Sequence, residues 1–152
     1  MLIRLRRVLT GFVFAFLSLS LVGTAWAQAA KEPKVVYHVD SAGRQVDSAL
    51  DHIHNQLVTA PNTKIVVVAL ADGIAFLLKG AQDAANVNGN TSYAVLVEQL
   101  KARGVRFEVC ENAMRGRRLT KEQFIPQADF TPAGIVSITH WQSVEGYAYF
   151  KP

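Results

Sequence analysis

The sequence predicts an α/β protein with three layers and a small, mostly parallel sheet of about five strands, a flavodoxin-like architecture. Strand-like apolar runs alternate with helix-like segments, which is typical of parallel sheets covered by helices. One run, 65–70, has no polar alternation, which indicates a strand buried on both faces. Among the topologies that right-handed crossovers allow, we favour the strand order 2-1-3-4-5, which makes strands one and three neighbours.

The first strand and the first helix follow from composition and spacing. The β-branched run 35–39 predicts the first strand, and the polar and small residues at 40–43 end it. Apolar residues then recur at helical spacing over 46–57, with polar residues between them. This segment predicts an amphipathic helix that ends before Pro61.

The middle of the chain continues the alternation. The strand at 65–70 is followed by a predicted short apolar helix at 74–81 and a polar loop at 86–90. A second amphipathic helix is predicted at 92–102. The alternating segment 105–109 then predicts the third strand, with one face less buried than in the second.

The last part of the chain is less regular. Short helical segments are predicted at 112–115 and 119–124. Pro132 is suited to the first turn of a final helix, and Gly146 is suited to its end. The remaining apolar segment, 147–150, predicts a short closing strand.

Residues 1–27 have the pattern of a secretory signal peptide. Three arginines precede the apolar run 8–22, and Ala25-Trp26-Ala27 has the small residues that a signal peptidase requires. An uncleaved membrane anchor is the alternative, but the run is shorter than the roughly 20 residues that a spanning helix needs. We therefore expect cleavage near Ala27, no stable membrane anchor afterwards, and a periplasmic or secreted protein.

Cleavage would leave a short lead-in at 28–33 and one α/β domain at 34–152. Three of the 16 basic residues lie in the leader, so the rest of the chain has 13 bases against 12 acids. A balance this close to neutral gives no support for nucleic-acid binding.

The residue types exclude several kinds of site. One cysteine excludes an internal disulfide framework, and no spacing of His, Cys and carboxylates predicts a metal site. The chain has neither a G-x-G-x-x-G nor a P-loop motif, so we expect no cofactor, and a flavin or nucleotide site would rest on fold analogy alone.

Cys110 is the main candidate for chemistry. It follows the predicted third strand and precedes a helix start at Asn112, whose N–H groups, together with Arg115, would stabilise a thiolate. In the favoured order, the carboxyl ends of strands one and three form the crevice where open α/β sheets bind ligands. Asp40 and Ser41 would line the opposite wall of that crevice.

Other interpretations of these residues stay open. Cys110 can be a buried cysteine that packs as a small apolar group. A Cys–His pair would need the fold to bring His38 or His140 to the sulfur. The turn 41–44 resembles a loop that cradles an anion, although a plain strand-to-helix turn fits it better.

Several blocks of the chain resemble the DsrE/DsrF-like family, and they lie in order along nearly the whole predicted domain. They include Ala49-Leu50, the strand at 65–70 with Leu77-Leu78-Lys79-Gly80, Gly104-Val105 with Phe107 and Cys110, Pro132-Ala133-Gly134, and Glu145-Gly146-Tyr147. The chain looks closest to a small, often exported branch of unknown function, related to sulfur-relay proteins of the TusBCD type. It departs from this branch after the second strand, where Ala71-Asp72-Gly73 stands in place of an H-G-x-G motif.

The resemblance implies a DsrE-like three-layer fold and homo- or hetero-oligomers. For sulfur-relay members it implies a cysteine that carries sulfur as a persulfide, and Cys110 is the residue that can match it. Two functions follow as hypotheses. The first is an exported sulfur carrier or thiol-handling protein that uses Cys110 and exchanges sulfur with a thiol or sulfur donor or acceptor protein. The second is a non-catalytic, oligomeric binding or assembly module in which Cys110 is structural.

Overall fold

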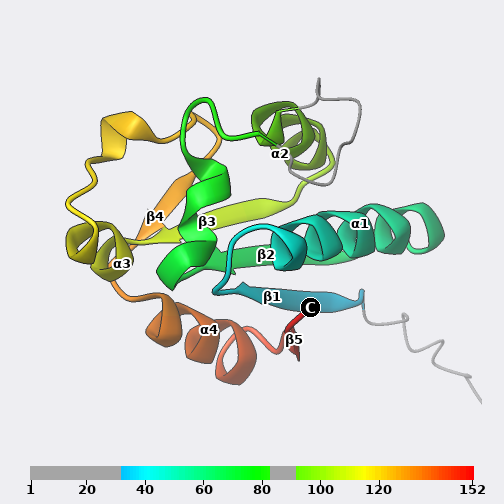
Figure 1. Cartoon of the computed structure of the whole chain (residues 1–152). Coiled ribbons are helices and arrows are strands. Elements are labelled where there is room, and N and C mark those ends of the chain that lie inside the picture. Colours follow the sequence, from blue (N-terminus) through cyan, green and yellow to red (C-terminus); the bar gives the residue numbers. More distant parts are fainter. Residues whose placement is uncertain (1–31, 83–91) are drawn as a thin grey trace, which may run out of the picture. The chain divides into compact units, whose positions relative to one another are not determined.

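A computed structural model of the chain describes residues 32–82 and 92–152 (Figure 1). The predicted signal peptide at 1–27 and the predicted loop at 86–90 lie outside these residues. The described part contains a five-stranded, all-parallel sheet with helices on both faces, which confirms the predicted α/β class. The strands are β1 (Lys34–Val39), β2 (Lys64–Ala69), β3 (Arg106–Cys110), β4 (Asp129–Thr131) and β5 (Ala148–Phe150).

The helices match the predicted segments with shifted ends. They are α1 (Arg44–Thr59), the 3₁₀ helix η1 (Ala71–Leu77), α2 (Tyr93–Ala102), α3 (Glu111–Gly116), the 3₁₀ helix η2 (Lys121–Gln123) and α4 (Gly134–Ser143). Helix α4 begins two residues later than Pro132, because Thr131 is still the last residue of β4. None of the helices within 32–82 and 92–152 is long and apolar enough to cross a membrane.

The predicted strand order is wrong. The sheet has the order β4-β3-β2-β1-β5, so β2 lies between β1 and β3. Consecutive parallel strands are usually neighbours, and here the chain steps one position at a time from β1 to β4 before it returns to the far side of β1. The order therefore reverses at β1, and the carboxyl ends of β1 and β5 form the switch point.

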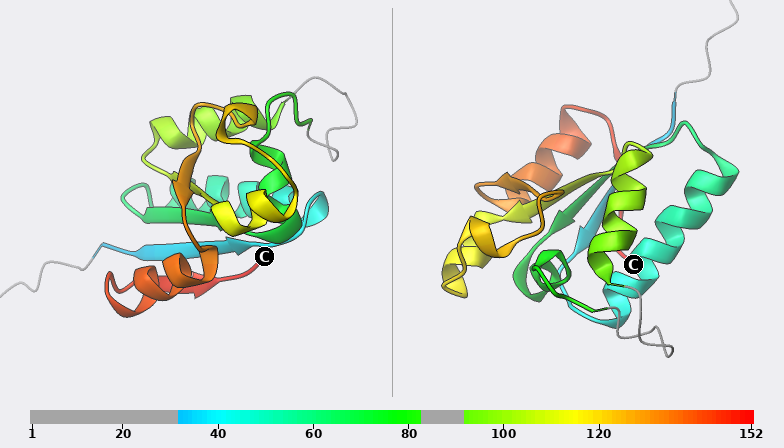
Figure 2. Two further views of the ribbon diagram at one scale, coloured as in Figure 1. Left: turned by 90° about the vertical axis from the view of Figure 1, so that its left-hand side faces the viewer. Right: turned by 90° about the horizontal axis from the view of Figure 1, so that it is seen from above.

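The two faces of the sheet carry unequal layers. Helices α1 and α2 and the 3₁₀ helix η1 cover one face, where they enclose the main core around Phe107 and Val67 (Figure 1). Helix α4 covers the opposite face (Figure 2). Between α4 and the sheet lies a small apolar cluster of Val36, Val66, Val68 and Ile138, against which Leu70, Trp141 and Tyr147 pack. This cluster is much smaller than the main core, so the polar contacts of α4 contribute more to holding the helix.

Candidate functional site

The parallel strands bring several candidate residues to one edge of the sheet. Cys110 ends β3, Thr131 ends β4 beside it, and Leu70 follows β2. Asp40 follows β1 at the same edge. Because side chains alternate along a strand, Cys110 points to the face that α4 covers.

Cys110 is buried, with 5% of its surface exposed, and its sulfur contacts the start of α4. The backbone N–H of Gly134, the first residue of α4, donates a hydrogen bond to Sγ at 3.2 Å. Helix α3 begins immediately after Cys110. The sulfur therefore lies at the positive end of the α4 dipole, which favours negative charge, whereas its side chain makes no capping hydrogen bond to α3.

Gly134 is required at this contact because no side chain fits there. A Cβ on Gly134 would lie 2.6 Å from Leu70 Cγ and 3.1 Å from Cys110 Cβ. The helix start consequently packs directly on the side chains that follow β2 and end β3. This close approach brings the Gly134 N–H within reach of the sulfur.

Replacing Gly134 with alanine should push the start of α4 away from the sheet. We expect a loss of about 1–3 kcal/mol in the free energy of unfolding, because an extra carbon must be accommodated in a filled site. Displacement of the helix start should also speed alkylation of Cys110 by iodoacetamide at neutral pH, because it uncovers the buried sulfur. Gly116→Ala is the matched control, since a Cβ there meets nothing within 4 Å. Equal stability and alkylation in the two variants would contradict this packing.

The charged residues that follow Cys110 bind one another. Glu111 lies 2.7 Å from Lys121 Nζ and 3.8 Å from Arg115 Nη1. Arg115 also donates to Asn112, and Arg117 pairs with Asp72 of η1. Asn112 and Arg115 therefore bind each other, and Arg115 pairs with the Glu111 carboxylate rather than with the sulfur.

Asp40 and Ser41 lie apart from Cys110, because β2 separates their strand from β3. Asp40 pairs with Lys151 at 2.5 Å, and the Ser41 hydroxyl donates to the same carboxylate at 3.5 Å. The hydrogen bond from Lys151 lowers the pKa of Asp40 below its ordinary value and raises that of Lys151. These residues form a separate polar cluster at the switch point between β1 and β5.

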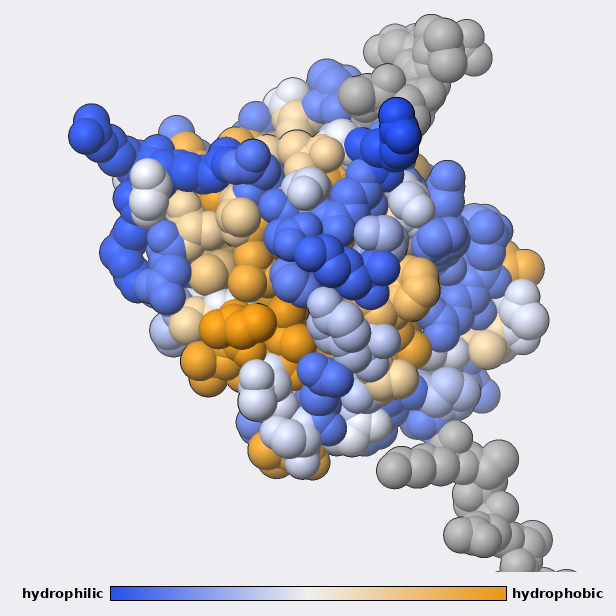
Figure 3. Space-filling view, turned by 60° about the horizontal axis from the view of Figure 1, so that its bottom comes forward, coloured by the Kyte–Doolittle hydropathy of each residue, from blue (hydrophilic) through white to orange (hydrophobic). Residues whose placement is uncertain are grey.

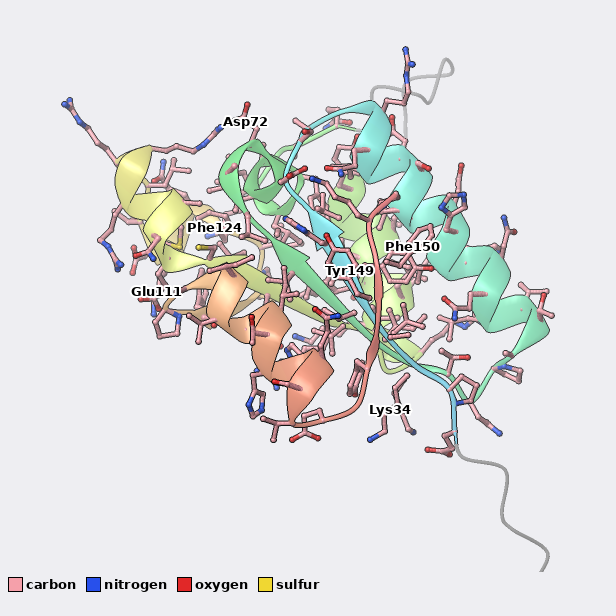
Figure 4. The ribbon with its side chains drawn as sticks, turned by 90° about the horizontal axis from the view of Figure 1, so that it is seen from below. Lys34, Asp72, Glu111, Phe124, Tyr149 and Phe150 are labelled. Carbon is pink, nitrogen blue, oxygen red and sulfur yellow. The ribbon has the colours of Figure 1, made fainter. Side chains whose placement is uncertain are left out.

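The two candidate histidines make their contacts elsewhere. His38 Nδ1 lies 2.8 Å from the Tyr149 hydroxyl and its Nε2 lies 3.8 Å from Asp40. His140 is exposed on α4, 3.7 Å from Glu145. Tyr149 and Glu111, the neighbour of Cys110, lie well apart on this face (Figure 4). The described residues thus give no support to a Cys–His pair, and within them no cluster of His, Cys and carboxylates could hold a metal.

His38 should make stability depend on pH. Burial lowers the pKa of His38 below 6.5, against the opposing effect of Asp40. The unfolded chain therefore binds the proton more readily, and the free energy of unfolding should fall as the pH drops from 7 through 6.5 and below. Urea denaturation from pH 8 to 5 should show this slope in the wild type and a smaller slope in His38→Gln. His54→Gln, which changes an exposed histidine of α1, should keep the wild-type slope; equal slopes in all three proteins would contradict the assignment.

Sequence reasoning missed the contacts that define this site. Leu70 and Gly134 were not among the candidate residues, although a glycine after Pro132 is a signal for close approach of a helix start. The Tyr149 contact with His38 depends on the parallel pairing of β1 with β5. That pairing leaves no trace in local sequence.

Comparisons with known proteins identify a family and the same fold. The family model described as the DsrE/DsrF-like family matches residues 27–152. Two solved structures are similar: the protein of unknown function MTH1491 from Methanobacterium thermoautotrophicum, and the ychN protein from E. coli. The alignment with the first has 25% sequence identity and a TM-score of 0.68, and it covers 80% of this chain and 100% of the MTH1491 chain. The alignment with the second has 15% sequence identity and a TM-score of 0.64, and it covers 79% of this chain and 99% of the ychN chain. The search of curated proteins gives no match.

Proposed function

Since this chain belongs to the DsrE/DsrF-like family, we propose that Cys110 is its functional group, a thiol that accepts sulfane sulfur and passes it to a thiol of a partner protein. The observation that supports this proposal is the hydrogen bond from the Gly134 N–H to Sγ. A backbone donor at the start of a helix stabilises a thiolate. The donor to Sγ would thus serve Cys110 where it is a thiolate, as the attacking group in loading and as the leaving group in release.

The proposed reaction needs no external oxidant. The Cys110 thiolate attacks a sulfane sulfur of a polysulfide, forming a new S–S bond as the donor's S–S bond breaks. The electron pair of the broken bond leaves with the donor, which departs shortened by one sulfur. In the second step an acceptor thiolate attacks the outer sulfur, and Cys110 leaves as a thiolate.

Burial of Cys110 sets a condition on this exchange. With 5% of the residue exposed, a donor reaches the sulfur only if the start of α4 or Leu70 moves aside. The small apolar cluster beneath α4 makes such a movement easier than one in the main core. Burial would also protect a bound persulfide from oxidation between the two steps.

Replacing Cys110 with serine should abolish sulfur loading. Intact-mass measurement of the wild type after incubation with polysulfide should show a gain of one sulfur atom, removed by dithiothreitol. Cys110→Ser should show no gain, because the described residues and the rest of the chain contain no other cysteine. A wild-type thiol that stays unmodified until the protein is unfolded would contradict the proposal.

We further propose that the protein works outside the cytoplasm as part of an oligomer. The leader at 1–27 supports export, although it lies outside the described residues. Recovery of a periplasmic or secreted form that begins near Gln28 would support cleavage. A form retaining residues 1–27 in the membrane would contradict it.

A non-catalytic assembly module is the second candidate function. It is favoured by the burial of Cys110 and by three apolar side chains of α4 and its C-cap that are 60–69% exposed, Ile135, Val136 and Val144. Apolar residues gather over this side of the molecule (Figure 3). Such patches mark interaction surfaces. An oligomer that forms equally in wild type and Cys110→Ser, together with a wild-type thiol that polysulfide leaves unmodified, would favour this candidate.

A further inference from the structure

Glu108 is a charged side chain inside the folded chain, and neither proposed function yet uses it. It lies on β3, two residues before Cys110, with 3% of its surface exposed. Burying a carboxylate is unfavourable unless it is paired and hydrogen-bonded. The partners of the Glu108 carboxylate therefore indicate its role in the fold.

The Glu108 carboxylate connects β3 to α4. Its Oε1 lies 2.8 Å from Arg106 Nε on the same strand. Its Oε2 accepts hydrogen bonds from the Ser137 hydroxyl and, at 3.4 Å, from Trp141 Nε1. The Arg106 guanidinium also lies over the Trp141 ring, 5.7 Å from its centroid. One carboxylate thus fixes two side chains of the helix.

The contacts of Glu108 and the contact of Cys110 both join β3 to the same side of α4. Glu108 and Cys110 are two apart on β3, so both point toward α4. On the helix, Gly134, Ser137 and Trp141 are spaced by three and four residues, so they share one side. The bonds from Ser137 and Trp141 to Glu108 therefore set the same helix position as the bond from Gly134 to the sulfur.

We infer that Glu108 is a positioning residue for Cys110: its carboxylate holds α4 in the position that keeps the Gly134 N–H on the sulfur. This inference rests on the proposed function, because it assigns a residue that controls the same thiol. Glu108 acts through α4 and does not itself contact the reacting sulfur.

A direct electrostatic effect of Glu108 would have the opposite sign. Removing a negative charge near a thiol favours the thiolate, whereas loosening the Gly134 donor disfavours it. The test replaces none of the other charged residues on the elements around Cys110, so their charges are the same in every variant. These residues are Arg106 on β3, Asp129 on β4, Glu111 and Arg115 on α3, Arg117 after α3, Lys121 on η2, Asp72 on η1 and His140 on α4. The direction of the change therefore separates the two effects.

The test is the pH dependence of Cys110 alkylation in the folded protein, measured with iodoacetamide. Glu108→Gln should raise the pH at which the rate reaches half of that variant's own maximum by about one unit. The maximum rate is read separately, because loosening α4 also opens the way to the buried sulfur. Ser137→Ala, which leaves the charge in place, should shift it in the same direction by about half a unit. Ile53→Val is the control, since it removes a buried methyl group on the opposite face of the sheet.

The outcomes are distinct. An unchanged or lower midpoint in Glu108→Gln and an unchanged midpoint in Ser137→Ala would overturn the positioning role while leaving the proposed function intact. A shift of equal size in Ile53→Val would overturn it too, because general loss of stability would then explain the effect. A wild-type thiol that does not react in the folded state overturns both proposals. If Glu108→Gln does not fold, Ser137→Ala decides.

Discussion

Replacing Gly73 with alanine is expected to destabilise the protein by about 3 kcal/mol, at the upper end of the range for overpacked sites. Gly73 lies in η1, where the chain crosses the end of β1. A Cβ there would be 2.3 Å from the carbonyl oxygen of Val39 and 2.6 Å from its carbonyl carbon. Both are backbone atoms, so no side-chain rotation relieves the clash. The Val39 oxygen also accepts the N–H of Leu70 at 2.8 Å, which a displacement would weaken.

Urea denaturation of Gly73→Ala beside Gly116→Ala measures this effect. Gly116 is the last residue of α3, and a Cβ there meets nothing within 4 Å. Alanine should therefore be neutral or stabilising by up to about 1 kcal/mol at that site. A Gly73→Ala protein as stable as the wild type would contradict the close packing of η1 on β1.

Replacing Phe107 with alanine should lower the free energy of unfolding by about 3–5 kcal/mol. Phe107 lies on β3, fully buried in the main core, and its ring meets the ring of Phe76 edge-on at 6.3 Å. Truncation removes the burial of the ring and leaves a cavity between the sheet and η1. The loss should appear as a lower urea midpoint with little change in the slope of the transition.

Phe107→Leu serves as the control for this cavity. Leucine keeps most of the apolar volume, so its loss should be clearly smaller than that of alanine. Cys110 lies on the opposite face of β3 from Phe107. Alkylation of Cys110 under native conditions should therefore survive Phe107→Leu. Equal losses in the two variants would contradict the account of the core.

The fold class could be predicted because the apolar periodicity of each main element is strong. The run at 65–70 has no polar alternation, and β2 is indeed covered on both faces. The amphipathic spacing from Val46 to Leu57 matches the buried side of α1. The spacing of apolar residues within each element shows which side is buried, so these elements can be predicted without knowing their neighbours.

The strand order could not be predicted in the same way. Each strand's hydrogen-bonding edges carry backbone groups that are the same for every sequence, so β1 has no local signal for β2 and β5 as its neighbours. Strand β4 was not identified because it has three residues, too few for a visible alternation. The wrong strand order is the reason that Asp40 and Ser41 were expected beside Cys110, since β2 in fact lies between β1 and β3.

The place of Cys110 in the fold could be predicted, but its contacts could not. Placing Cys110 at the carboxyl end of a parallel strand follows from the order of the elements. Its hydrogen bond with Gly134 spans 24 residues and depends on how α4 packs across the sheet. Arg115, which was expected to stabilise the sulfur, instead binds Asn112 and Glu111.

Sulfur loading of the native wild-type protein, followed by intact mass after incubation with polysulfide, tests the central claim most directly. A thiol that Gly134 and α4 hold ready at the end of β3 should take up one sulfur atom while the protein is folded, and should lose it to an added acceptor thiol. Uptake only after the chain is unfolded in urea would contradict the claim that Cys110 is the working group.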